Sequence, residues 1–186
     1  MKQRILVWAL TLVLLAGAWG VSKATLPDDA STAAFPTVAA LDEPASVRNL
    51  EVTVTDVHVA SRVTDADGWS AEGTWVVVDL EAASVVTQEA AILGLAELVV
   101  GDRTFSATDR GTTFAKQRLV TGVARAGSLA FELPADALVG TATLRLGVPN
   151  GSPNEVLLDG LIELPIVLDD LPVEVEVLLD ENGWAR

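Results

Sequence analysis

His58 is the one histidine of this 186-residue chain, and it stands two positions after Asp56. An Asp–His pair can activate a serine nucleophile or bind a metal ion. No G-x-S-x-G segment accompanies it, so a hydrolase triad has no recognisable nucleophile. One histidine and no cysteine exclude an imidazole zinc site on ligand count, because only carboxylates remain as partners. We therefore expect His58 to be an ordinary strand residue and expect no catalytic residue, metal or cofactor.

Acidic residues beside glycine form a second group with possible chemistry. Asp65-Ala66-Asp67-Gly68 and Asp180-Glu181-Asn182-Gly183 resemble fragments of oxygen-ligand calcium loops. Neither continues to the spaced acids and terminal glutamate of an EF-hand loop. Asp-Gly and Asn-Gly steps also make tight turns without any ion. We interpret both segments as turns and keep Asp65 and Asp67 as alternative Ca²⁺ candidates.

The other candidates belong to a binding surface. Trp69 follows the first turn, and a tryptophan there can stack on a glycan, fill a partner's pocket or cap its own core. Residues 147–185 contain nine acids and no Lys or Arg, which fits a solvated outer face or a docking surface for a basic partner or cations. The candidate surface residues are Asp65, Asp67, Trp69, Glu174 and Glu176.

The composition excludes several classes of function. The chain carries 12 Lys and Arg against 26 Asp and Glu, a net charge of −14, and its pI is about 4.2. A phosphate-backbone binder needs clustered cations, so we expect no nucleic-acid partner. The absence of cysteine excludes disulfides, thiolate metal sites and cysteine nucleophiles. Phosphate-binding glycine loops are also absent from the sequence.

The N-terminus has the pattern of an export leader. Lys2 and Arg4 precede an uncharged apolar run, residues 5–21. As a helix this run rises roughly 25 Å, short of a hydrocarbon core of about 30 Å but close enough for Lys23 and the N-terminal cations to reach the interfaces. We expect residues 1–24 to be a signal-anchor helix. The alternative is a signal peptide cleaved after Ser22-Lys23-Ala24, which would give a secreted protein.

The rest of the chain divides into a spacer and a β domain. Residues 25–48 contain three prolines and no sustained period, which predicts a flexible spacer. Residues 49–186 alternate with a period of two, which predicts seven to nine short strands in an all-β antiparallel sandwich. Within it, a phase change predicts a bulge near Asp56, and Pro165 predicts an edge strand. Expected inward-facing residues of the last run are Val173, Val175, Val177 and Leu179.

Four segments within residues 50–148 follow a known pattern: GTWVVVDLEAAS, LAELVVGDRTFSA, LVTGVARAGSLAFELP and ATLRLGV. They resemble the telokin-like, immunoglobulin-like domains of exported actinobacterial and Firmicute proteins, many of unknown function. In that pattern a valine-rich strand precedes a glycine hairpin, a Gly-x-x-x-x-G segment and a Phe-x-x-Pro strand end. The matching residues are Val76 to Leu80, Gly101, Gly122, Gly127, Phe131 and Pro134. Residues 81–84 depart from the pattern, where the family usually has asparagine, and residues 150–186 are unmatched. The resemblance implies an immunoglobulin-like fold more than an activity.

These observations together predict a non-enzymatic, immunoglobulin-like domain exported across the cytoplasmic membrane and tethered to it by the N-terminal helix. We expect its partner to be an envelope or membrane protein. The alternative is a secreted sandwich that binds a small ligand, a glycan or Ca²⁺.

Overall fold

The computed structural model describes residues 2–24, 34–85, 91–150, 157–158 and 160–185. It divides into two compact units, Met1–Ala33 and Ala34–Arg186. The first unit contains helix α1 (Lys2–Ala24), whose described side chains are exposed. Among the residues that the structure describes, no helix combines the length and apolarity that crossing a membrane requires.

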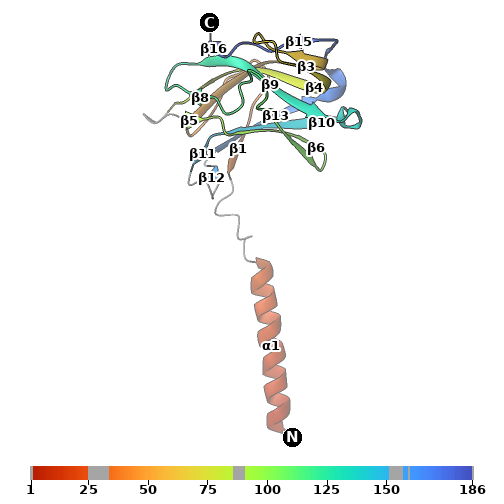
Figure 1. The fold of residues 1–186 in the computed structure, drawn as a ribbon. Coiled ribbons are helices and arrows are strands. Elements are labelled where there is room, and N and C mark those ends of the chain that lie inside the picture. Colours follow the sequence, from red (N-terminus) through yellow and green to blue (C-terminus); the bar gives the residue numbers. More distant parts are fainter. Residues whose placement is uncertain (1, 25–33, 86–90, 151–156, 159, 186) are drawn as a thin grey trace. The chain divides into compact units, whose positions relative to one another are not determined.

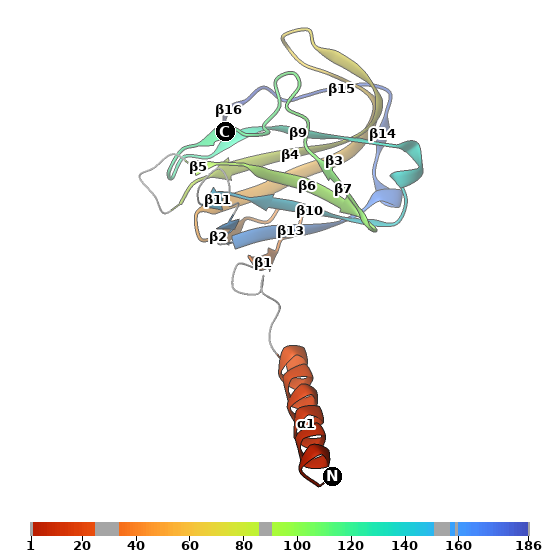
Figure 2. The same cartoon turned by 60° about the horizontal axis from the view of Figure 1, so that its bottom comes forward.

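The second unit is built from two main sheets (Figures 1 and 2). The first has the order β1 (Phe35–Val38), β13 (Gly160–Val167), β10 (Thr141–Gly147), β6 (Leu95–Val100), β7 (Arg103–Ser106). The second has the order β14 (Val173–Glu174), β3 (Leu50–Thr64), β4 (Ser70–Ala83), β9 (Arg125–Leu133), β16 (Gly183–Trp184), with β2 (Ala45–Val47) and β15 (Val177–Leu178) also pairing with β3. Short ladders join β5 (Ala91–Ile92) to β8 (Arg118–Leu119) and β11 (Pro149–Asn150) to β12 (Leu157–Leu158). Single 3₁₀ turns lie at Ala135–Ala137 and Leu168–Asp170.

The main core lies between the two sheets, because alternate residues of the long strands point inward. Phe131 and Leu129 of β9 face Leu144 and Leu146 of β10 across it, all four being fully buried. This arrangement confirms the predicted all-β sandwich. The sheets are antiparallel except where β1 pairs with β13 and where β14 and β15 pair with β3, which are parallel.

The predicted bulge is present in β3. The pairing of β3 with β4 shifts register between Val54 and Asp56, so Thr55 is the extra residue. Val54 and Val57 both face the core, while Thr55 and Asp56 are exposed. The bulge therefore keeps valines inward on both sides of an acidic residue that points outward.

The predicted spacer is too long. Residues 34–48 belong to the β unit, because β1 pairs with β13 and β2 pairs with β3. Pro36 is compatible with β1, since an edge strand has one unpaired side. Strand β1 pairs with the first half of β13. Although β13 contains Pro165, it is therefore not an edge strand over that half. Residues 25–33 lie outside the described residues.

The last predicted strand is also partly wrong. Val177 and Leu179 are buried as expected, but Val173 is 75% exposed and Val175 is 85% exposed. The run is interrupted between β14 and β15, each only two residues long. A short strand at the sheet edge has no second layer outside it, so alternation there does not imply burial.

Residues 171–185, here called the C-terminal strap, cross the outer face of the seven-stranded sheet. The strap pairs with β3 on one side of the sheet and, through β16, with β9 on the other (Figure 2). Beneath it lies a second, smaller hydrophobic cluster that includes Trp75, Val77 and Leu179. The strap thus covers polar as well as apolar side chains of this face.

Candidate functional site

The residues richest in chemistry form a row across three strands on the outer face. Asp56 of β3 lies opposite Asp79 of β4, and Asp79 lies opposite Ser128 of β9. His58 is two positions beyond Asp56 and therefore points to the same face. Without the bulge at Thr55, Asp56 would point into the core instead.

The imidazole lies between carboxylates. His58 Nδ1 is 3.6 Å from Asp56 Oδ2 and 3.9 Å from Glu174 Oε1, and His58 Nε2 is 3.9 Å from Asp79 Oδ2. His58 is only 8% exposed, and its buried Nε2 makes no hydrogen bond. One donor atom each from Asp56, His58 and Asp79 lie within 4.8 Å of one another. We call Asp56, His58 and Asp79 the acid–imidazole cluster.

Each cluster carboxylate has one oxygen held by the fold. Asp56 Oδ1 accepts the N–H of Val57, and Asp79 Oδ1 accepts the hydroxyl of Ser128. Ser128 Oγ in turn accepts the N–H of Asp180 from the C-terminal strap at 2.8 Å. Burial raises the pKa of Asp79. Like-charge repulsion from Asp180 and Asp56 raises this pKa further, whereas the Ser128 hydrogen bond and the charge of His58 lower it.

The order of these groups does not match a hydrolytic triad. A triad needs the histidine between serine and aspartate, so that it can take the hydroxyl proton. Here Asp79 lies between Ser128 and His58, and Ser128 is fully buried. The arrangement can hold a positive charge, either a proton or a cation, but it has no activated nucleophile.

The predicted turn at Asp65 is held by hydrogen bonds to the Asp65 carboxylate. Asp65 is 6% exposed, and its carboxylate accepts the N–H of Trp69 at 2.7 Å and that of Thr112 at 2.8 Å. Burial favours the neutral acid, but these N–H donors outweigh it and hold the pKa of Asp65 below its ordinary value. Asp67 is exposed and accepts the Thr112 hydroxyl. Both oxygens of Asp65 therefore already bind the fold's own donors.

Trp69 belongs to an aromatic layer. Its ring meets that of Trp75 edge-to-face at 6.2 Å, and the Arg110 guanidinium lies 6.0 Å from the Trp69 ring. Arg110 is also paired with Glu132 at 2.7 Å. The half-buried Trp69 thus caps the smaller core, with part of its surface left open.

The two C-terminal candidates lie on the strap at the β3 edge. Glu174 and Glu176 are exposed, and Glu174 alone reaches the imidazole of His58. They alternate with the exposed Val173 and Val175. The structure therefore brings Glu174 to the acid–imidazole cluster, whereas Asp65, Asp67 and Trp69 belong to a separate hydrogen-bonded turn.

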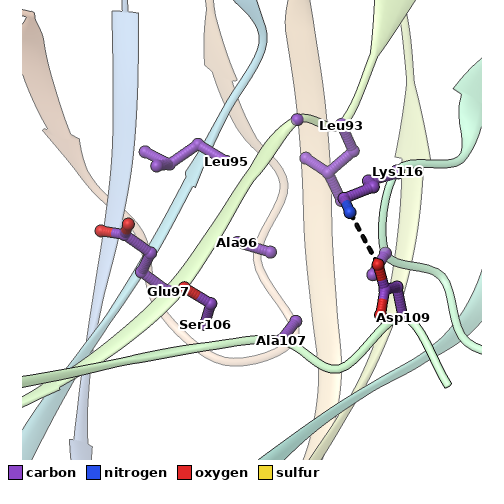
Figure 3. A pocket seen from close by; sticks show the side chains of 10 residues that line it. Leu93, Leu95, Ala96, Glu97, Ser106, Ala107, Asp109 and Lys116 are labelled. Carbon is purple, nitrogen blue, oxygen red and sulfur yellow. Dashed lines mark hydrogen bonds and ion pairs between the residues drawn. The ribbon is translucent and has the colours of Figure 1, made fainter.

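A cavity of about 340 Å³ lies beside β6 and β7 (Figure 3). Glu97 and Ser106 line one part, and the Lys116–Asp109 ion pair, 2.7 Å long, lines another. Among the described residues that line the cavity, Lys116 is the one cation, and it is already paired to Asp109.

Sequence reasoning missed the cluster's Asp79. Asp79 interrupts the apolar run 75–80 of β4, which was a usable signal, because a charge in a central strand requires a partner. Comparisons with protein-family models, curated proteins and solved structures gave no match.

Proposed function

We propose that the chain is an exported, non-enzymatic immunoglobulin-like domain that acts as a binding or accessory module at the cell envelope. The observation that carries the export role is the distribution of charge. Lys2, Arg4 and Lys23 fall in the first 24 residues, whereas all 26 acids lie beyond them. Cations at the tip of an apolar segment stay on the cytoplasmic side, which sends the acidic domain outward.

In this proposal α1 tethers the domain to the membrane. Its apolar run is short, so a tether requires local thinning of the bilayer or snorkelling of the flanking cations. Cleavage after Ala24 is the alternative and would release the domain. An intact-mass measurement of the native protein separates a tethered chain of full length from a shortened, secreted one.

Protease added to intact cells tests the export role itself. The β unit should be digested to the same extent in intact cells as in lysed cells, since it would lie outside. A Lys2→Glu/Arg4→Glu variant is the control, because removing the cationic tip should abolish or reverse the orientation. Protection of the unmodified chain in intact cells would overturn the proposal.

The binding role is supported by the strap segment 173–176. Two exposed valines alternate there with two exposed glutamates at the edge of a sheet. Such an edge suits an extended, basic segment of an envelope protein, through main-chain pairing and charge. A photo-crosslinker at Val175 should capture a specific partner, whereas one at Val139, which is 61% exposed elsewhere, should not. Equal capture at both positions, or none at Val175, would refute this surface.

A second candidate is a small-ligand or glycan module, supported by a hollow around Trp184. Trp184 is 64% exposed and lies with Glu81, Asp180 and Glu181 around a hollow of about 670 Å³. Carboxylates beside an exposed indole suit sugar hydroxyls. Thermal shifts with sugars, lost in Trp184→Ala, would favour it. A Ca²⁺ shift lost in Asp67→Ala would favour the calcium alternative without disturbing Asp65.

A further inference from the structure

We propose that the acid–imidazole cluster binds one divalent first-row transition-metal ion of the Mn²⁺-to-Zn²⁺ class, with His58, Asp79 and Asp56 as ligands. The proposal does not depend on export or on a protein partner. It rests on the convergence of three donors on one point of the outer face, which the chain's single histidine and lack of cysteine had argued against.

The unpaired Nε2 of His58 is the first argument. A buried ring nitrogen without a hydrogen bond is costly, so it marks a place where a ligand is missing. It faces Asp79 Oδ2 at 3.9 Å, which is too far for a hydrogen bond. Two ligands of one tetrahedral metal ion lie about 3.4 Å apart, given bonds of about 2.1 Å. The observed separation of 3.9 Å between Nε2 and Asp79 Oδ2 needs only a small contraction around an ion. Asp56 supplies the third donor, since one donor atom from each of the three residues lies within 4.8 Å of the others.

The orientation of the carboxylates is the second argument. Asp56 and Asp79 each use Oδ1 for a bond within the fold and direct Oδ2 at the imidazole. Metal ligands are commonly held in this way by outer hydrogen bonds. Glu174 Oε1 lies 3.9 Å from Nδ1, on the other side of the ring from Asp79, so its negative charge favours a proton on Nδ1 and leaves Nε2 for the ion.

The donor set determines the class of ion. One imidazole nitrogen with carboxylate oxygens suits Mn²⁺, Zn²⁺ and the ions between them, whereas Ca²⁺ needs six to eight oxygen ligands. The surrounding charge is negative, since Asp180 and Glu174 lie beside the cluster. A cation here also relieves the like-charge repulsion on Asp79.

Calorimetry with Zn²⁺ and Mn²⁺ on the full chain, purified without a polyhistidine tag, tests the proposal. We expect one ion per chain and a loss of affinity of about tenfold or more in His58→Gln and in Asp79→Asn. Glu176→Gln is the matched control, because Glu176 is an exposed acid of the same strap outside the cluster, and its affinity should be unchanged. Millimolar Ca²⁺ should not compete. If Asp79→Asn fails to fold, Asp56→Asn replaces it, since the Asp56 side chain is 60% exposed.

Nitrogen-15 spectra of the imidazole give a second, independent readout. The chain has one histidine, so every imidazole signal belongs to His58. Diamagnetic Zn²⁺ should shift Nε2 and leave Nδ1 as the protonated nitrogen. No one-to-one binding, equal affinity in His58→Gln, displacement by Ca²⁺, or unmoved ring signals would each overturn the proposal. A ring protonated on both nitrogens in the presence of Zn²⁺ would show that the cluster holds only a proton.

Discussion

Ser128→Ala should loosen the C-terminal strap and destabilise the β unit. The fully buried hydroxyl donates to Asp79 and accepts the N–H of Asp180 at 2.8 Å, so alanine removes two bonds, one of them to a carboxylate. A hydrogen bond to a charged group contributes about 1.5–3 kcal/mol and a neutral one about 0.5–1.5 kcal/mol, which together give about 2–4.5 kcal/mol. For a unit of about 150 residues this lowers Tm by about 4–18 °C.

Urea unfolding measures this loss. Ser46→Ala is the matched control, since Ser46 is exposed and its hydroxyl donates to the Glu51 carboxylate at the surface. The structure also predicts a pH dependence. Ser128 favours ionised Asp79, so its removal raises the pKa of Asp79 further, and the loss should be larger at about pH 7 than at about pH 4. A Ser128→Ala variant as stable as Ser46→Ala, or a loss that does not change with pH, would refute this account of the site.

Three further predictions follow from single residues. Gly111 has φ +68°, and a Cβ added there would lie 2.5 Å from the Trp69 ring, whereas Gly101, at φ +60°, has open space around it. Gly111→Ala should therefore lower the free energy of unfolding in urea by about 1–3 kcal/mol more than Gly101→Ala. Asp79 has a folded-state pKa above 3.8, so its ionisation lowers the free energy of unfolding as pH rises from about 3.8 through the folded-state pKa. Asp79→Asn should therefore flatten the dependence of this free energy on pH in that range. Asp65 has a folded-state pKa below 3.8, so the stability that its carboxylate contributes is lost as pH falls from about 3.8 through the folded-state pKa. Asp65→Asn should remove this loss of stability at acid pH in the same titration.

The fold was predictable to the extent that it follows from local alternation. The β3 bulge could be inferred because Val54 and Val57 lie out of phase in the sequence yet both belong in the core. The strand β1 could not, because four residues containing Pro36 show no period and gain their partner from β13, far along the chain.

The candidate site was less predictable, because its members meet only through long-range packing. Glu174 and His58 are separated by more than a hundred residues, and no spacing rule relates them. The valines around Glu174 predicted an ordinary outer face, but the strap crosses the sheet and turns Glu174 toward the imidazole while leaving Val173 and Val175 exposed. Alternation describes which residues share a face and carries no information on what covers that face.

The extra residue of β3, Thr55, affects both the hydrophobic core and the acid–imidazole cluster. With regular pairing, Val54 inward would place Asp56 inward as well, and a carboxylate in the main core would be strongly unfavourable. The bulge at Thr55 removes this conflict by turning Asp56 outward, and the same change sets it opposite Asp79 and on the face of His58. A feature that the hydrophobic core requires therefore also assembles the acid–imidazole cluster. A deletion of Thr55 leaves Val54 inward and Asp56 outward in regular alternation, so it should retain metal binding wherever the chain still folds.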